Sequence, residues 1–120
     1  MPTLELSHEQ IAALAEAPKS GPVVMLNLLK FARGGGSKSY AQYAEAFERL
    51  LTKHGGRFVY RGRAAELLVG EESWDAVALV EYPSRLAFAE LIGSHEYAAI
   101  APLRKGGLER TVLYATDPRT

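Results

Sequence analysis

Cysteine is absent from this sequence of 120 residues, which excludes disulfide bonds and thiolate metal sites. Long apolar runs are also absent, and a bilayer-spanning helix needs about 20 such residues. The start of the sequence lacks the basic and apolar stretches of a secretion signal. Charge of one sign does not prevail, because 14 Lys and Arg balance 14 Asp and Glu. We therefore expect a cytoplasmic protein with neither a membrane nor a nucleic-acid partner.

Apolar residues make up 48% of the chain, which is enough for a packed core. We expect a single domain over residues 1–120, with an N-terminal helix over 7–17 and a core over 22–118. Strands are predicted over 23–31, 57–69, 76–82 and 108–116, with helical segments after the first and third of them. This βαββαβ order predicts an α+β fold, in which helices cover one face of a four-stranded antiparallel sheet.

Polar residues and glycines mark the expected helix ends. Ser7 with Gln10 and Ser39 with Gln42 have the spacing of capping boxes, so we expect helices to begin at these serines. Gly55-Gly56 predicts a left-handed stop for the second helix.

The segment before the last strand is interrupted. Gly93 is expected to break the helix that Ser84 begins, and Pro102 to end or kink the helix that follows. Gly62 indicates a bulge or kink in the second strand.

The strands are apolar on both faces, whereas an antiparallel sheet with one face in water should alternate apolar and polar residues. In the first strand Leu26 and Leu28 point to one face, while Met25 and Leu29 point to the other. The helices of one chain cover only one face, so something else must cover the second. The N-terminal helix is one candidate, but it is short for a sheet of four strands. We therefore predict a homodimer.

Five short motifs follow one another along residues 22–118. They are Tyr40 with Tyr43, Gly55-Gly56-Arg57, Arg61-Gly62, Glu81-Tyr82-Pro83-Ser84 and Ser94-His95-Glu96-Tyr97. With these motifs the chain resembles domain-of-unknown-function family thirteen-thirty, although Val69-Gly70 stands where the family often carries Glu-Gly. The family belongs to the dimeric α+β barrel, or ferredoxin-like, superfamily. The resemblance implies two sheets packed face to face, with a small-molecule pocket in each subunit between sheet and helices.

Asn27 is the first candidate for a site residue, because an amide inside an apolar strand must be hydrogen-bonded or face a wet cavity. Haem-degrading and quinone-forming monooxygenases of the superfamily carry an Asn on the first strand and a Trp on the third. The trio of Asn27, Trp74 and His95 resembles the site of these enzymes in element order. His95 and Tyr97 are the candidates for moving a proton, against the alternative that His95 is a surface residue of a first helical turn.

Tyr43, Arg104 and Arg110 are further candidates for the pocket wall, although an Arg near an interface often serves as an ion-pair partner. The histidines form neither an HxH nor an HExxH pair, so no metal site is expected. The glycine-rich loop fails the P-loop pattern, since Ser37 stands where a glycine must precede Lys38. We expect no cofactor.

Three interpretations of function stay open. The first is a cofactor-free enzyme, like a monooxygenase or an isomerase, that acts on a small apolar or aromatic molecule. The second is a dimer without catalysis, which binds such a molecule or is purely structural. The third is a haem-binding or haem-degrading protein. We favour the first, but the fold by itself does not select a reaction.

Overall fold

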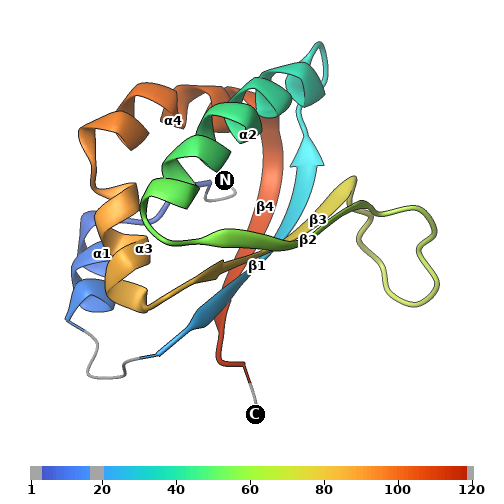
Figure 1. Cartoon of the computed structure of the whole chain (residues 1–120). Coiled ribbons are helices and arrows are strands. Elements are labelled where there is room, and N and C mark those ends of the chain that lie inside the picture. The colour runs from blue at the N-terminus through green and yellow to red at the C-terminus, as the bar shows by residue number, and fades with distance from the viewer. Residues whose placement is uncertain (1–3, 17–20, 119–120) are drawn as a thin grey trace.

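The computed structural model describes residues 4–16 and 21–118 (Figure 1). Its elements are α1 (His8–Ala15), β1 (Val23–Phe31), α2 (Gly36–Lys53), β2 (Arg57–Arg63), β3 (Ala76–Tyr82), α3 (Arg85–Ile92), α4 (His95–Gly107) and β4 (Leu108–Thr116). The expected order of strands and helices is confirmed. The N-terminal helix begins as predicted, with a capping box at Ser7, whereas its expected end at Ala17 lies outside the described residues.

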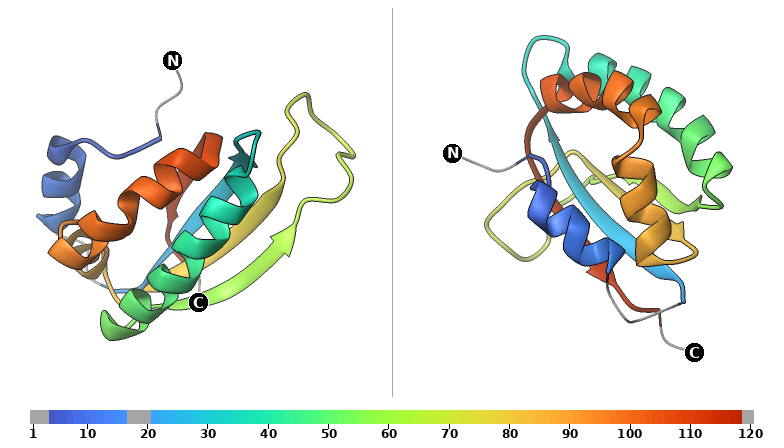
Figure 2. Two further views of the ribbon diagram at one scale, coloured as in Figure 1. Left: turned by 90° about the horizontal axis from the view of Figure 1, so that it is seen from above. Right: turned by 90° about the vertical axis from the view of Figure 1, so that its left-hand side faces the viewer.

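All neighbouring strands are antiparallel, in the order β2-β3-β1-β4. Helices α2 and α4 lie side by side over one face of this sheet, and α1 and α3 pack together at one end of it (Figures 1 and 2). The register places Leu26 of β1 opposite Leu79 of β3 and Tyr114 of β4. Because residues paired in this way share a face, the register also fixes which side chains meet the helices.

The core lies between the helices and the sheet. Val23, Met25 and Leu29 of β1 are at most 2% exposed on this side. Leu51 of α2 and Leu91 of α3 belong to the same core cluster as Val23 and Met25. Alternate residues of β1 therefore supply the core, as the sequence predicts for a strand with one face under helices.

The opposite side, which we call the open face, carries apolar residues that no helix covers. Its members come from all four strands, by cross-strand pairing, and are Val24, Leu26, Leu28, Tyr60, Val77, Leu79, Val112 and Tyr114. Tyr60 and Tyr114 are 53% and 64% exposed. Helix α1 does not cover this face, because Leu6 and Leu14 pack against the core cluster on the helix side. The alternative that the N-terminal helix covers the second face of the sheet is therefore wrong.

Helix α2 begins earlier than its predicted capping box. Gly35, with φ of 100°, precedes the first helical residue, Gly36, and Ser39 already lies inside the first turn. The Ser39 hydroxyl instead donates to the Leu103 carbonyl of α4 at 2.9 Å. The stop at the other end is as predicted, since Gly55 has φ of 80° and the Gly56 amide donates to Leu51.

Strand β2 ends at Arg63, six residues before the predicted end at Val69. The apolar run Leu67-Leu68-Val69 had suggested a strand, but these side chains are 54%, 88% and 94% exposed in a protruding loop (Figure 1). The Ala64 amide donates to the Asp75 carbonyl and closes this loop at its base. The irregularity in β2 falls between Phe58 and Tyr60, so the bulge predicted at Gly62 is misplaced.

Ser84 and Ser94 cap α3 and α4 through their side chains, and Gly93 separates the two helices. Pro102 does not end α4, which continues to Gly107. A proline removes one amide donor from a helix, but α4 is held from outside by its packing on α2. No helix in the described part of the chain is long and apolar enough to cross a membrane.

Candidate functional site

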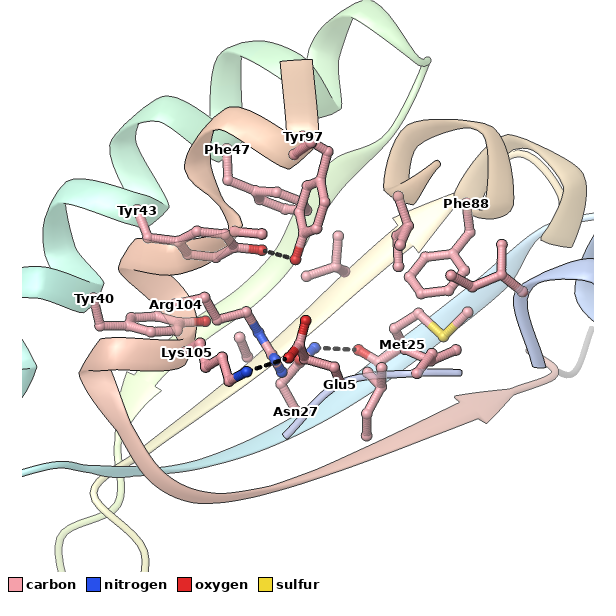
Figure 3. Close-up of a pocket in the computed structure, with 18 of the residues that line it drawn as sticks. Glu5, Met25, Asn27, Tyr40, Tyr43, Phe47, Phe88, Tyr97, Arg104 and Lys105 are labelled. Carbon is pink, nitrogen blue, oxygen red and sulfur yellow. Dashed lines mark hydrogen bonds and ion pairs between the residues drawn. The ribbon is translucent and has the colours of Figure 1, made fainter. Parts of the chain in front are cut away.

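A cavity of about 520 Å³ lies between the helices and the sheet (Figure 3). Its size is in the usual range of small-molecule pockets, about 300–1,000 Å³. Aromatic rings form much of its wall, from Tyr40, Tyr43, Phe47, Phe58, Tyr82, Phe88 and Tyr97. Polar groups enter from β1, α4 and the segment before α1. The cavity therefore combines an apolar body with a few polar contacts, as ligand sites do.

One face of α2 builds the main aromatic wall. Tyr40, Tyr43 and Phe47 follow at helical spacing, so their rings lie on one side of the helix. The Tyr43 ring is 5.3 Å from Tyr40 and 5.4 Å from Phe47, and it stacks on the latter. Tyr97 of α4 meets Tyr43 and Phe47 edge-on, at 6.2 and 6.4 Å. Flat apolar molecules are the natural partners of such a wall.

The hydroxyls of Tyr43 and Tyr97 are hydrogen-bonded to each other at 3.1 Å (Figure 3). Burial raises the pKa of Tyr43 well above its ordinary value, and it raises the pKa of Tyr40 and Tyr82 as well. These three phenols stay protonated near neutral pH. They can donate or accept hydrogen bonds to a bound molecule, but they do not act as ready-made bases.

Asn27 faces the cavity from the middle of β1, on the same side as Met25 and Leu29. Its Nδ2 donates to the Met25 carbonyl at 3.3 Å. Among the described residues this is the one hydrogen bond that the Asn27 side chain makes. An amide that is partly buried and partly unused is well placed to orient a ligand.

The cationic side of the cavity comes from the last turns of α4. Arg104 Nη1 donates to the Leu4 carbonyl at 2.6 Å, and Lys105 forms an ion pair with Glu5 at 3.1 Å. Both contacts hold the segment before α1 against the mouth of the cavity. The charge of Arg104 also acts on Tyr40, where it opposes the rise in pKa caused by burial.

Of the site residues predicted from the sequence, the structure brings four together around this cavity: Asn27, Tyr43, Tyr97 and Arg104. Trp74, His95 and Arg110 are not among the lining residues. Two of these three residues, Trp74 and His95, belong to the trio inferred from the superfamily.

Trp74 and Arg110 contact each other instead, with the guanidinium 4.4 Å from the indole ring. Arg110 also binds the carboxylate of Glu72 and the carbonyl of Ser73. It lies opposite Lys30 on the side of the open face, where it anchors the base of the 64–75 loop. In a single subunit these two residues therefore do not line the cavity.

His95 is the first residue of α4 and is exposed, whereas Tyr97, two positions later, points into the cavity (Figure 3). A helix turns by about 200° over two residues, so adjacent candidates need not share a face. The expected trio of Asn27, Trp74 and His95 does not assemble, and the alternative of a surface histidine describes His95 correctly.

Tyr40, Glu5, His8 and Lys105 also line the cavity and were missed in the sequence. Tyr40 could have been found, because it lies three residues before Tyr43 on the same helical face. Glu5, His8 and Lys105 gave no such signal. Glu5 and His8 belong to the N-terminal segment, which lies outside the βαββαβ pattern.

Haem does not fit this donor set. His54 and His95 lie outside the cavity, and of the described histidines only His8 lines it, from an exposed position at the start of α1. The described residues contain no group of three His, Asp or Glu side chains that could hold a metal ion.

A family model described as "Domain of unknown function (DUF1330)" matches residues 35–117. The chain belongs to this family. DUF1330 thus covers the chain from the start of α2 to the end of β4, and with them most of the cavity. No curated protein matches the chain.

Solved structures agree with this assignment. A Rhodopseudomonas palustris protein of unknown function is 28% identical, with a TM-score of 0.89 over 100% of this chain and 99% of that one. A dabb family protein from Mesorhizobium loti, with a ferredoxin-like fold, is 12% identical and has a TM-score of 0.61 over 83% of this chain and 99% of that one. A cofactor-independent oxygenase from Streptomyces nogalater is 13% identical, with a TM-score of 0.61 over 84% and 96%. This DUF1330 chain therefore has a ferredoxin-like fold.

Proposed function

We propose that this DUF1330 protein is a homodimer in which each subunit binds a small aromatic or other apolar molecule and converts it without a cofactor. The observation that carries the proposal is the cavity itself, where stacked aromatic rings surround the partly unused amide of Asn27 and the Tyr43–Tyr97 hydroxyl pair. In a packed core, polar groups that are not fully hydrogen-bonded would only cost free energy. In a ligand site they orient the bound molecule.

The open face is the observation that supports the dimer. Leu26, Leu28, Val77 and Leu79 lie at the centre of the sheet without a covering element, and Tyr60 and Tyr114 extend the same apolar surface. Apolar surface of this extent is normally an interface. The same face of a second copy is self-complementary to it under twofold symmetry. Such a dimer buries at least about 1,200 Å² in total.

The chemical roles follow from the positions of the polar groups. Asn27 orients the bound molecule. The Tyr97 hydroxyl lends its proton to the reacting atom and takes it back, while Tyr43 holds that hydroxyl in place through their hydrogen bond. The fold shared with a cofactor-independent oxygenase is consistent with this scheme but does not select the reaction.

Binding without catalysis is the second candidate function. Burial raises the pKa of Tyr40, Tyr43 and Tyr82, so these cavity hydroxyls are hydrogen-bonding groups rather than bases at neutral pH. A protein that only carries or senses an aromatic molecule needs no more than this.

Both functions require an accessible cavity, and 2-naphthamide is a suitable neutral probe. At about 0.3 kcal/mol per non-hydrogen atom, its 13 such atoms give a Kd of about 1 mM or tighter. Ala101 lines the cavity from α4, so Ala101→Phe should weaken binding at least about tenfold, or about 1.4 kcal/mol, by filling the space. Calorimetric titration measures the loss.

Ala99→Phe is the matched control, because Ala99 is exposed on the same helix and does not line the cavity. It should bind the probe as the unchanged protein does. Equal binding by both phenylalanine variants, or no saturable binding at all, would contradict a ligand site in this cavity.

The stability of an Asn27→Leu variant tests whether the fold needs this amide. Asn27 makes one hydrogen bond, of 3.3 Å, to a backbone carbonyl two residues away in its own strand. Replacing a polar site residue with an apolar one often relieves a cost to the fold, so we expect an unfolding free energy that is unchanged or raised by up to about 1 kcal/mol. Denaturant titration at matched protein concentration measures it. A loss of about 1–3 kcal/mol would show that Asn27 serves the fold.

A further inference from the structure

Arg104 is a cation on the cavity wall without a carboxylate partner among the described residues. Its neighbour Lys105 is neutralised by Glu5 on the rim. The partners of Arg104 are uncharged, because it donates to the Leu4 carbonyl and is hydrogen-bonded to the Tyr40 side chain. Figure 3 shows the Arg104 side chain extending from α4 into the space between the helices and the sheet. Within the described part of the chain, Arg104 therefore meets the cavity without a carboxylate paired to it.

A guanidinium in such a position is built for an oxyanion. It carries five N–H donors in a planar fork, and the bonds to the Leu4 carbonyl and the Tyr40 side chain do not use all of them. Carboxylates accept two parallel hydrogen bonds from the same fork, and these are stronger than bonds between neutral groups. Partial burial adds to the attraction, because a cation away from water gains more from a counter-charge.

The surroundings of Arg104 define the rest of the ligand. Its charge reaches the hydroxyls of Tyr40, Tyr43 and Tyr82, where it opposes the larger effect of burial on their pKa. These residues belong to the aromatic wall, and Asn27 lines the same cavity. An anionic head beside Arg104 would therefore belong to a molecule whose body lies against aromatic rings.

We propose that the cavity selects small aromatic carboxylates, with the carboxylate paired to Arg104 and the ring against the Tyr40–Tyr43–Phe47 wall. This inference rests on the proposed function and adds to it the charge and orientation of the ligand. The Leu4 carbonyl helps to position the guanidinium, and Lys105 serves the N-terminal segment rather than the ligand.

Two probes of the same shape test the charge. 2-Naphthoate carries a carboxylate at neutral pH where 2-naphthamide carries a neutral amide, so their affinities differ through the head group. The unmodified protein should bind 2-naphthoate at least about tenfold more tightly, which corresponds to about 1.4 kcal/mol. A ratio below about threefold in calorimetric titrations overturns the inference, whether or not any variant folds.

The variants assign the preference to one side chain. Arg104→Met keeps the length and loses the charge, so it should weaken 2-naphthoate about tenfold and change 2-naphthamide less than about twofold. If Arg104 only fastened the N-terminal segment, both probes would weaken equally, and the inference would be wrong. Arg49→Met is the matched control, because it makes the same substitution at an exposed position of α2 that does not line the cavity, and it should keep the preference for the anion.

The two proposals fail in different ways. If neither naphthalene probe binds saturably, the proposed function itself is wrong. If both bind with the same affinity, the ligand site stands and the preference for carboxylates does not.

Discussion

A Leu79→Lys variant is expected to be a monomer at concentrations where the unchanged protein is a dimer. Leu79 lies in the middle of the open face, opposite Leu26 of β1 and Tyr60 of β2. In the proposed dimer the lysine would place two unpaired ammonium groups near the twofold axis, away from water. We expect the dimer Kd to rise at least about 100-fold, or about 2.8 kcal/mol. Light scattering at micromolar concentration should then give the monomer mass of 13.1 kDa.

Leu86→Lys is the control for this experiment. Leu86 is 47% exposed on α3, on the helix side of the molecule, so its replacement changes the net charge equally but spares the open face. This variant should keep the mass of a dimer. A monomer mass for the unchanged protein, or a Leu79→Lys protein that stays dimeric, would refute the proposed interface.

A Gly107→Ala variant is expected to lose about 2–3 kcal/mol of unfolding free energy. Gly107 ends α4 where it meets the start of α2, and the two backbones touch. A Cβ at Gly107 would lie 2.9 Å from the Gly36 carbonyl oxygen and 2.9 Å from the Tyr40 amide nitrogen. The Gly107 carbonyl also accepts a hydrogen bond from Ala32 at 2.9 Å. Backbone atoms cannot turn away as a side chain does, so the helices must separate.

Gly106→Ala provides the comparison, because a Cβ at Gly106 meets nothing within 4 Å. Alanine favours helix over glycine, so we expect this variant to gain about 0.5–1 kcal/mol. Denaturant titrations of both variants at one protein concentration measure the difference. Equal stability of the two variants would show that the contact between α2 and α4 tolerates a methyl group.

Local patterns predicted most of the fold. Strand β4 has the predicted bounds because Leu108 to Thr116 is bordered by Gly107 and Asp117-Pro118. The stop at Gly55-Gly56 was visible because a left-handed backbone favours glycine. Two signals misled. Leu67-Leu68-Val69 is apolar but exposed, and Pro102 sits inside α4 because packing on α2 compensates for its missing amide.

The candidate site was less accessible from the sequence. Asn27 could be found, since a lone amide in an apolar strand is anomalous wherever the strand lies. Arg104 and Arg110 looked alike in the sequence, but α4 turns Arg104 toward the cavity and β4 turns Arg110 toward Trp74. Glu5 reaches the site by folding back onto Lys105, 100 residues later in the chain. A contact between residues so far apart in the sequence cannot be predicted from a local sequence pattern.

Strand β1 serves two surfaces at once. Asn27 faces the cavity, while its neighbours Leu26 and Leu28 belong to the open face on the other side. In a dimer built on that face, occupancy of the cavity and association of subunits are reciprocal. Whatever free energy a bound molecule adds to the association, association adds to the binding of that molecule. Affinities of different variants are therefore comparable only at the same protein concentration, and a substitution on either side of β1 has to be assayed for both events.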